Sequence, residues 1–273
     1  MNFAVGADEA AFAETVRGAL ASYQPVGWSP GAALDDRDAS LSAGLNALGI
    51  AEAAEAGHGF VAAAGLELGR ACAPLALFDE LAVGEKALAA SGLARYADGR
   101  SAALDVRRDG AFLVPLEGAQ MEPALDSQGF VRLRDAGERA PLPELGTWAA
   151  FHTAYLGGLA AAALALAVDH ARARIQFGKP LLALAPVQQL LADAAAVARG
   201  LELLAWEEAG DPWPALVHAG GAACRVCEVS HQVHGAIGFA LEAPLHSFFR
   251  RAHATRIFTG AVARAARGVP AAA

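Results

Sequence analysis

The chain has 273 residues, of which 55% are hydrophobic, 18% charged and only 7% aromatic. Its formal charge is −8 and it has no long basic block, which argues against nucleic acid or an anionic membrane as its main partner. Most apolar residues are Ala, Leu and Val, and alanine both favours helices and permits close helix contacts. The composition therefore predicts a mainly α protein of one large domain or two small ones.

The three cysteines, Cys72, Cys224 and Cys227, are too few for a disulfide framework and suit a reducing compartment. The first twenty residues place acidic side chains where a signal peptide needs a basic start and an apolar run. We therefore expect a cytoplasmic protein. Cys224 and Cys227 precede His231 and His234, but one straight helix would spread these four residues over roughly 15 Å. Since zinc needs all its ligands within one coordination sphere, we expect no metal site.

The first part of the chain predicts helices at 7–22, 38–48, 59–72 and 75–90, from apolar residues at helical spacing. Gly49 is expected to cap the second helix, and Pro74 to stop the third. From residue 98 onward, short β-prone runs at 102–106, 111–115 and 129–133 predict a small antiparallel sheet. We assign residues 1–97 to an N-terminal helical domain and residues 98–144 to a reduced β region.

Residues 145–273 predict an antiparallel four-helix bundle. A long helix is expected at 145–176, followed by helices at 186–209, 214–233 and 244–267, each with a proline near its start. The uncharged stretch 147–168 is long enough to span a bilayer. It is dominated by Ala and Gly, and a helix that is apolar all round also suits the centre of a bundle. We therefore interpret it as a core helix, with no membrane partner.

Two segments of the predicted bundle carry candidate functional residues. In the first, Arg172 and Arg174 precede Gln176, Phe177 and Gly178, and the second reads Gln232-Val-His234-Gly235-Ala236-Ile-Gly238-Phe239. Each segment alone is compatible with a capped helix end or a tight turn. An arginine and amides beside glycine turns also suit phosphate and adenine.

Taken together, RxQFGKP…VQxxLAD followed by QxHGAIGFxxExPL resembles the C-terminal bundle of the acyl-CoA dehydrogenase family. The resemblance covers about residues 145–260 and extends more loosely to Leu48-Gly49-Ile50 and to the segment from Glu67 to Pro74. It implies a flavoenzyme fold in which a glutamate removes the α-proton of an acyl-CoA thioester. In the family FAD accepts the β-hydride, and an electron-transferring flavoprotein reoxidises the flavin.

The chain departs from the family at the catalytic glutamate. Family members carry this residue at the position matched by Thr259 or, in some members, at the position matched by Trp148. A threonine hydroxyl is far too weak a base to replace a carboxylate, and tryptophan cannot act as one. We therefore assign no catalytic residue to this chain. The middle β region is also much shorter than in the family.

The resemblance also implies one half of a cofactor site. Family positions that contact the adenine and pyrophosphate of the neighbouring subunit's FAD are matched by Arg174, Gln176, Phe177, Gln232, Gly235 and Ala236. Residues 261–263 lack the hydroxyl and amide that help hold a subunit's own flavin. This asymmetry predicts a non-catalytic subunit of a heterotetrameric acyl-CoA dehydrogenase, which completes the FAD site of a full-length catalytic subunit. Heteromers of this kind recur in steroid side-chain degradation, so we expect a steroid-derived acyl-CoA as the partner's substrate.

Two alternatives stay open at this stage. The chain could form a self-sufficient homo-oligomeric enzyme that uses Glu144, Asp105 or His152 as a relocated base. It would then hold flavin alone. It could instead be a flavin-free scaffold module that kept only the bundle, in which case it would affect no dehydrogenase activity.

Overall fold

The computed structural model describes residues 5–23, 39–97, 99–122, 130–208 and 210–268. Residues 38, 129 and 209, at the ends of three predicted elements, lie outside these ranges. The α-helices are α1 (Ala7–Ala19), α2 (Ala39–Ala47), α3 (Ile50–Ala56), α4 (His58–Arg70), α5 (Ala76–Val83), α6 (Gly146–Ala173), α7 (Ala185–Ala205), α8 (Trp213–His234) and α9 (Leu245–Ala266). Two 3₁₀ turns, η1 (Leu181–Ala183) and η2 (Gly235–Phe239), lie between the bundle helices.

A seven-stranded sheet and a two-stranded hairpin complete the described structure. The sheet strands are β1 (Ala87–Ala90), β2 (Leu93–Arg95), β3 (Ala102–Arg107), β4 (Gly110–Pro115), β5 (Met121–Glu122), β6 (Phe130–Arg132) and β7 (Glu138–Ala140). Their order is β5-β6-β2-β1-β3-β4-β7, and β1 pairs with β3 in parallel while the other pairs are antiparallel. The hairpin consists of β8 (Ile175–Gln176) and β9 (Lys179–Pro180).

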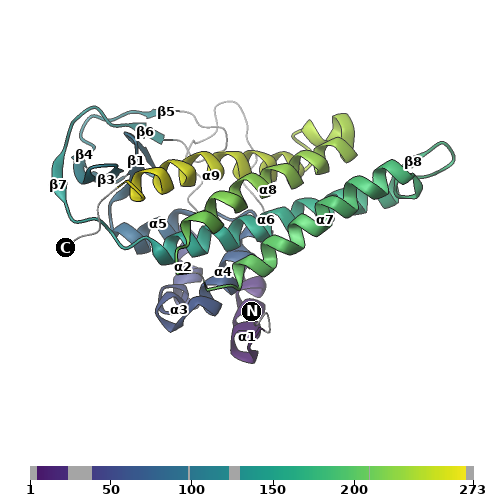
Figure 1. Cartoon of the computed structure of the whole chain (residues 1–273), viewed down its shortest axis with the longest axis horizontal. Coiled ribbons are helices and arrows are strands. Elements are labelled where there is room, and N and C mark those ends of the chain that lie inside the picture. Colours follow the sequence, from purple (N-terminus) through teal and green to yellow (C-terminus); the bar gives the residue numbers. More distant parts are fainter. Residues whose placement is uncertain (1–4, 24–38, 98, 123–129, 209, 269–273) are drawn as a thin grey trace.

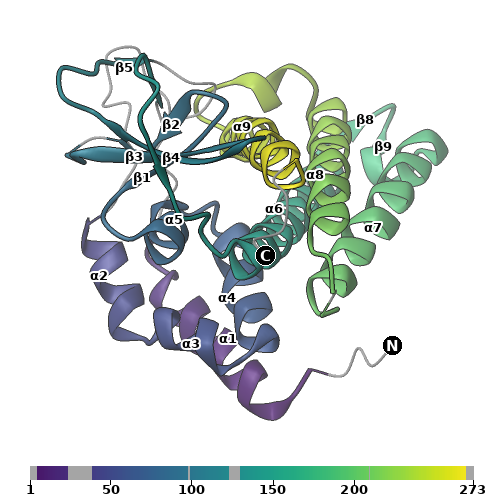
Figure 2. The ribbon, with the colours of Figure 1, turned by 60° about the vertical axis from the view of Figure 1, so that its left-hand side comes forward.

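Helix α6 lies at the centre of the molecule and packs against α4, α7, α8 and α9 (Figure 1). The sheet lies beside one end of the bundle, where β1 and β3 contact α9 and β1 contacts α5 (Figure 2). The β8–β9 hairpin lies at the opposite end of the bundle, beyond the end of α6 (Figure 1). The structure therefore confirms the mainly helical fold with a small sheet and a C-terminal four-helix bundle.

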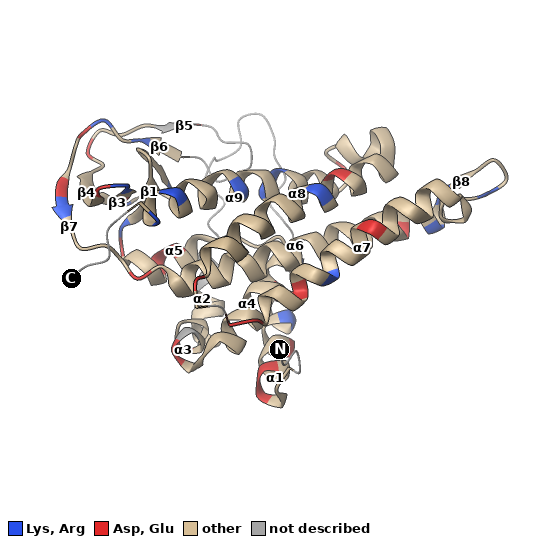
Figure 3. Ribbon diagram, viewed as in Figure 1, with Lys and Arg blue, Asp and Glu red and all other residues tan. Residues whose placement is uncertain are grey.

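Charge is distributed unevenly over these elements (Figure 3). Helix α1 has two acidic residues in its first turn, Asp8 and Glu9. Helix α9 contains four arginines and no acidic residue over its whole length. The net negative charge of the chain therefore coexists with a strongly basic helix in the bundle.

Four sequence predictions of local structure need correction. The helix predicted at 75–90 is α5 followed by β1, because Gly84 ends α5 at a φ of 66° and the next apolar run joins the sheet. The sheet is mixed rather than antiparallel, and its first two strands precede residue 98. Helix α3 was not expected. The long bundle helix ends at Ala173, before the hairpin turn at Phe177 and Gly178.

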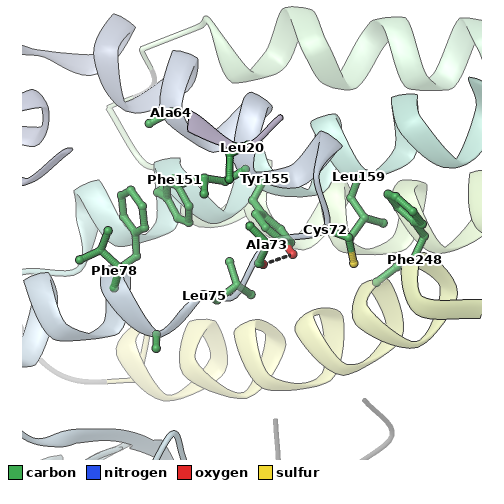
Figure 4. Close-up of a cluster of buried hydrophobic side chains, with 14 of the residues drawn as sticks. Leu20, Ala64, Cys72, Ala73, Leu75, Phe78, Phe151, Tyr155, Leu159 and Phe248 are labelled. Carbon is green, nitrogen blue, oxygen red and sulfur yellow. Dashed lines mark hydrogen bonds between the residues drawn. The ribbon is translucent and has the colours of Figure 1, made fainter. Parts of the chain in front are cut away.

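The main hydrophobic core joins the N-terminal helices to α6 (Figure 4). The aromatic ring of Phe78 on α5 stacks on that of Phe151 on α6. The hydroxyl of Tyr155, also on α6, donates a hydrogen bond of 2.8 Å to the carbonyl oxygen of Ala73. All three side chains of Phe78, Phe151 and Tyr155 are buried. This contact between the connection after α4 and the middle of α6 holds the N-terminal part against the bundle.

Helix α6 is long and apolar enough, by length and composition, to cross a membrane. However, 67% of its most apolar window is buried inside the protein. Its neighbours on several sides are other helices of the chain, which explains why it has no polar face. These contacts agree with the predicted core helix.

Glycines allow α4 and α6 to approach closely, and one of them provides a stability test. A Cβ on Gly158 of α6 would overlap the backbone carbonyl oxygen of Leu66 on α4. We expect Gly158→Ala to lower the free energy of unfolding by about 2 kcal/mol, because backbone atoms of two helices must move apart. Urea denaturation measures this change.

The matched control is Gly200→Ala on α7, where a new Cβ meets nothing within 4 Å. Alanine favours a helix over glycine by about 1 kcal/mol, so this variant should be as stable as the original protein or more stable. Equal effects of the two substitutions would contradict the close packing of α4 and α6.

Candidate functional site

A groove of about 520 Å³ lies at the hairpin end of the bundle. Its polar walls come from the end of α6, from β8 and from the end of α8, and its apolar wall comes from η1, α7 and η2. The polar lining residues are His170, Arg174, Gln176, Gln232 and His234. The apolar ones include Leu181, Val187, Leu190 and Ile237. Gly235 and Ala236 complete the lining at the start of η2.

The groove brings together five of the six residues predicted to contact a cofactor. Arg174, Gln176, Gln232, Gly235 and Ala236 line it, although they come from segments almost sixty positions apart in the sequence. The sixth, Phe177, does not line it. Its side chain is 87% exposed at the tip of the β8–β9 hairpin.

Local backbone geometry places these residues. Arg174 leaves the helix in an extended conformation, and its carbonyl oxygen accepts a hydrogen bond of 2.8 Å from the N–H of Leu181 beyond the hairpin. The two-residue turn has positive φ at both positions, 49° at Phe177 and 75° at Gly178, as a tight hairpin requires. On the facing side, Gly235 ends α8 at a φ of 66° and its N–H bonds to the carbonyl of His231.

Every charged or titratable residue that lines the groove is basic. Arg174 is joined there by His170 and His234, whose rings stack with centroids 4.5 Å apart. Burial lowers the pKa of His170, and the nearby His234 and Arg174 lower it further. His234 Nδ1 lies 2.8 Å from the carbonyl oxygen of Ser230, to which it donates, so Nε2 carries no proton in the neutral ring.

Sequence reasoning missed both groove histidines as candidate site residues. A signal was available for each, because His170 precedes Arg174 by one helical turn and His234 directly precedes Gly235. The stacking of the two rings could not be predicted from the sequence. Residues 64 positions apart become neighbours only when the helices of the bundle pack together.

The donor set of the groove fits an adenosine diphosphate group. A guanidinium and two carboxamides can bind a diphosphate, and the groove has no carboxylate among its lining residues to repel it. The aliphatic side chains of Leu181, Val187 and Leu190 offer an apolar surface for a purine. The residues present therefore fit the adenosine diphosphate half of FAD.

The two positions that the resemblance aligns with the family's catalytic glutamate are filled by buried side chains. Trp148 and Thr259 are each 2% exposed. The indole N–H of Trp148 donates to Asp79 Oδ1 at 2.7 Å. The hydroxyl of Thr259 donates to the carbonyl oxygen of Thr255, one turn earlier in α9, at 2.8 Å. Neither polar group is available to a substrate in this arrangement.

A buried polar network surrounds Trp148. The guanidinium of Arg95 on β2 donates two hydrogen bonds to the carboxylate of Asp79 on α5, at 2.6 and 2.7 Å. The same guanidinium lies 2.7 Å from His152 Nε2 on α6 and stacks over the ring of Phe258 on α9 at 4.1 Å. The network thus ties the sheet to α5, α6 and α9.

Two of the three candidate relocated bases are engaged inside the protein. His152 is fully buried, with Nδ1 donating to the Trp148 carbonyl at 2.8 Å and Nε2 accepting from Arg95. Asp105 on β3 is fully buried, and Arg107 donates to it at 2.6 Å. Glu144 is exposed and accepts a hydrogen bond of 2.7 Å from the N–H of Gly146, which supports the start of α6.

His152 gives the protein a pH dependence with a defined sign. Complete burial, and then the charge of Arg95, lower the pKa of His152 well below its ordinary value. As the pH falls below about 6.5, His152 therefore binds a proton in the unfolded chain before it does so in the folded protein. The free energy of unfolding then decreases by at most about 1.4 kcal/mol per pH unit for this one histidine. We expect stability to decrease as the pH falls through this range, and His152→Gln to have a smaller slope.

Urea denaturation at a series of pH values measures the slope. His218→Gln, at an exposed position on α8, is the control and should leave it unchanged. An equal slope in the His152→Gln variant would show that His152 does not stay neutral in the folded protein.

Comparison with known proteins agrees with this arrangement. Residues 142–212 match the acyl-CoA dehydrogenase C-terminal domain. A 3-sulfinopropanoyl-CoA desulfinase of Paraburkholderia xenovorans is 34% identical over 111 residues, which are 37% of this chain and 28% of the relative. A cyclohex-1-ene-1-carbonyl-CoA dehydrogenase of Geobacter metallireducens is 36% identical over 127 residues, 42% of this chain and 33% of the relative. The match therefore spans a third or less of these relatives.

Solved structures resemble almost the whole chain. The ChsE4–ChsE5 complex of Mycobacterium tuberculosis aligns with a TM-score of 0.66 at 19% identity, over 98% of this chain and 97% of that chain. A variant of the Tcur3481–Tcur3483 steroid ACAD aligns with a TM-score of 0.72 at 18% identity, over 97% of both chains. Butyryl-CoA dehydrogenase from Megasphaera elsdenii gives a TM-score of 0.72 at 17% identity, over 98% of both chains.

The fold is therefore that of the acyl-CoA dehydrogenases. Its bundle also contains the match to the acyl-CoA dehydrogenase C-terminal domain over residues 142–212.

Proposed function

We propose that this chain is the non-catalytic subunit of a heteromeric, FAD-dependent acyl-CoA dehydrogenase. It contributes its basic groove to the FAD site of a full-length catalytic partner. One observation carries the proposal: the groove residues come together on the surface, whereas both positions of the family glutamate are filled by buried side chains, Trp148 and Thr259. The groove fits a nucleotide, and neither position aligned with the family glutamate holds a carboxylate.

Each groove residue has a role in this proposal. The guanidinium of Arg174, which has no ion-pair partner within the described part of the chain, pairs with the diphosphate. Gln176 and Gln232 donate from their amides, and the aliphatic wall shelters the adenine from water. When bound, FAD supplies the hydride acceptor for oxidation of the partner's acyl-CoA.

The relatives support the finer parts of the proposal. The ChsE4–ChsE5 complex and the Tcur3481–Tcur3483 steroid ACAD are each named as pairs of proteins, and both share the fold. We therefore propose a heterotetramer with a steroid-derived acyl-CoA as the partner's substrate. An electron-transferring flavoprotein reoxidises the flavin in this proposal, as the family resemblance implies.

The first test is the flavin-to-protein ratio, measured by visible absorbance. We expect a ratio near zero for this chain purified alone. Co-expression with full-length acyl-CoA dehydrogenases from the same cell should give a mixed complex that contains flavin and oxidises acyl-CoA. A full flavin content in the chain alone would favour the self-sufficient enzyme. No effect on any co-expressed dehydrogenase would favour the scaffold module.

Arg174 provides the residue-level prediction. In the mixed complex, Arg174→Ala should weaken FAD binding by about tenfold or more, because a charge-assisted hydrogen bond contributes about 1.5–3 kcal/mol. Flavin released during equilibrium dialysis measures the change. Arg172→Ala is the matched control, since Arg172 is also exposed, pairs with Asp169 at 3.4 Å and does not line the groove. Equal flavin retention by both variants would remove Arg174 from the site.

A further inference from the structure

The groove differs from the rest of this acidic chain in the character of its charge. Its charged and titratable lining residues are one arginine and two histidines, and no carboxylate belongs to it. The formal charge of the whole chain is −8. A pocket of this composition attracts anions.

The two imidazoles form a unit that spans two helices. His170 near the end of α6 and His234 at the end of α8 stack with an angle of 21° between their rings. Stacked rings do not hydrogen-bond to each other through their edges. In the described structure neither ring nitrogen of His170 has a hydrogen-bond partner. Within the described part of the chain, both nitrogens of His170 and Nε2 of His234 therefore have no hydrogen-bond partner, and both residues line the groove.

The charged and titratable groups near His170 come from the end of α6 and from α8. Arg174 follows on the same segment, and α8 contributes His234. The lining residues from η1, α7 and η2 are all uncharged. Asp169 and Arg172, which flank His170 on α6, are both largely exposed and pair with each other at 3.4 Å. The immediate environment of His170 is therefore positive.

We propose that His170, stacked on His234, makes the groove a proton-coupled site for an adenosine diphosphate group, whose binding brings uptake of a proton by His170. The identity of the ligand rests on the proposed function. Burial is the main cause that lowers the pKa of His170, and His234 and Arg174 lower it further. A diphosphate placed beside His170 offsets the effect of these two neighbours. Binding should therefore strengthen as the pH falls from about 8 to about 6, by up to about tenfold per unit for one coupled proton.

Nuclear magnetic resonance of the intact chain tests this proposal directly. The ring signals of His170 and His234 are followed through a pH titration without ligand and with saturating ADP. We expect ADP to raise the pKa of His170 by about one unit. The affinity for ADP, obtained from the same spectra, should be several-fold higher at the acidic end of the titration.

Two variants test whether proton uptake by His170 is coupled to the binding of ADP. His170→Gln keeps a polar side chain at a half-buried position and should reduce the increase of ADP affinity at low pH. His218→Gln, on the exposed side of α8 and outside the groove, should retain the full dependence. An unchanged pKa of His170 at saturating ADP would overturn the proposal, as would no binding of ADP at either end of the titration.

FAD and coenzyme A both contain an adenosine diphosphate group. Repeating the titration with each of them shows which of the two molecules the groove accepts. A shift with ADP and FAD supports the coupled site and agrees with a groove that accepts the adenosine diphosphate half of FAD. A shift with ADP and coenzyme A but not with FAD supports the coupled site and contradicts the proposed function. If ADP has no effect while the co-expressed complex still carries flavin, this inference fails and the proposed function stands.

Discussion

Replacing Asp79 by alanine should lower the free energy of unfolding by about 3–5 kcal/mol, because it leaves a buried guanidinium without its carboxylate. Asp79 and Arg95 are each 2% exposed, and two hydrogen bonds join them. The substitution also removes the acceptor of the Trp148 indole N–H. Urea denaturation, followed by circular dichroism, measures the loss.

Asp169→Ala is the control for charge removal alone. Asp169 is 75% exposed and pairs with Arg172 at 3.4 Å, so its loss should cost less than about 1 kcal/mol. The double variant Asp79→Leu with Arg95→Met should be more stable than Asp79→Ala, because no uncompensated charge remains. If Asp79→Ala and Asp169→Ala cost the same, the pair does not hold the sheet against α5.

Restoring the family glutamate with Thr259→Glu should produce a less stable protein and no dehydrogenase. Thr259 is buried on α9, and its hydroxyl already donates to its own helix. A larger, ionisable side chain there must be accommodated in packed surroundings, at a cost of about 3 kcal/mol or more. Thermal unfolding measures the loss, and acyl-CoA-dependent reduction of an artificial electron acceptor measures activity.

Thr259→Ser is the matched control, because it keeps the hydroxyl that donates to Thr255. It should be close to the original protein in stability. Acyl-CoA oxidation by the Thr259→Glu chain alone would show that a substrate reaches this position. Such a result would contradict the proposal that the chain lacks its own active site.

Asp79 and Thr259 lie in the same region of the protein, around the Asp79–Arg95 network. Trp148 occupies one of the family's glutamate positions and bonds to Asp79, while Phe258, next to Thr259, lies against Arg95. The side chains at both positions therefore belong to, or adjoin, the contact between the sheet and the bundle. Their burial serves the packing of this chain.

The fold could be predicted best in long segments where the pattern of a helix can be read from neighbouring residues. Helices α7, α8 and α9 begin within a residue of their predicted starts, because a proline near the first turn and helical periodicity agree there. The prediction failed at 75–90, where short apolar runs suit a helix or a strand equally well. The parallel pairing of β1 with β3 also left no local trace, since it depends on a partner in space.

The candidate site, like the fold, could be predicted from the sequence only in part. By itself, the sequence determined the residue types of the two motif segments and the absence of glutamate at positions 148 and 259, because identity and spacing are properties of the chain. Only the tertiary structure decided that Phe177 is exposed and does not line the groove, that His170 stacks on His234 and that Asp79 pairs with Arg95. These contacts join residues far apart in sequence, and burial and electrostatic environment arise only when helices pack and exclude water.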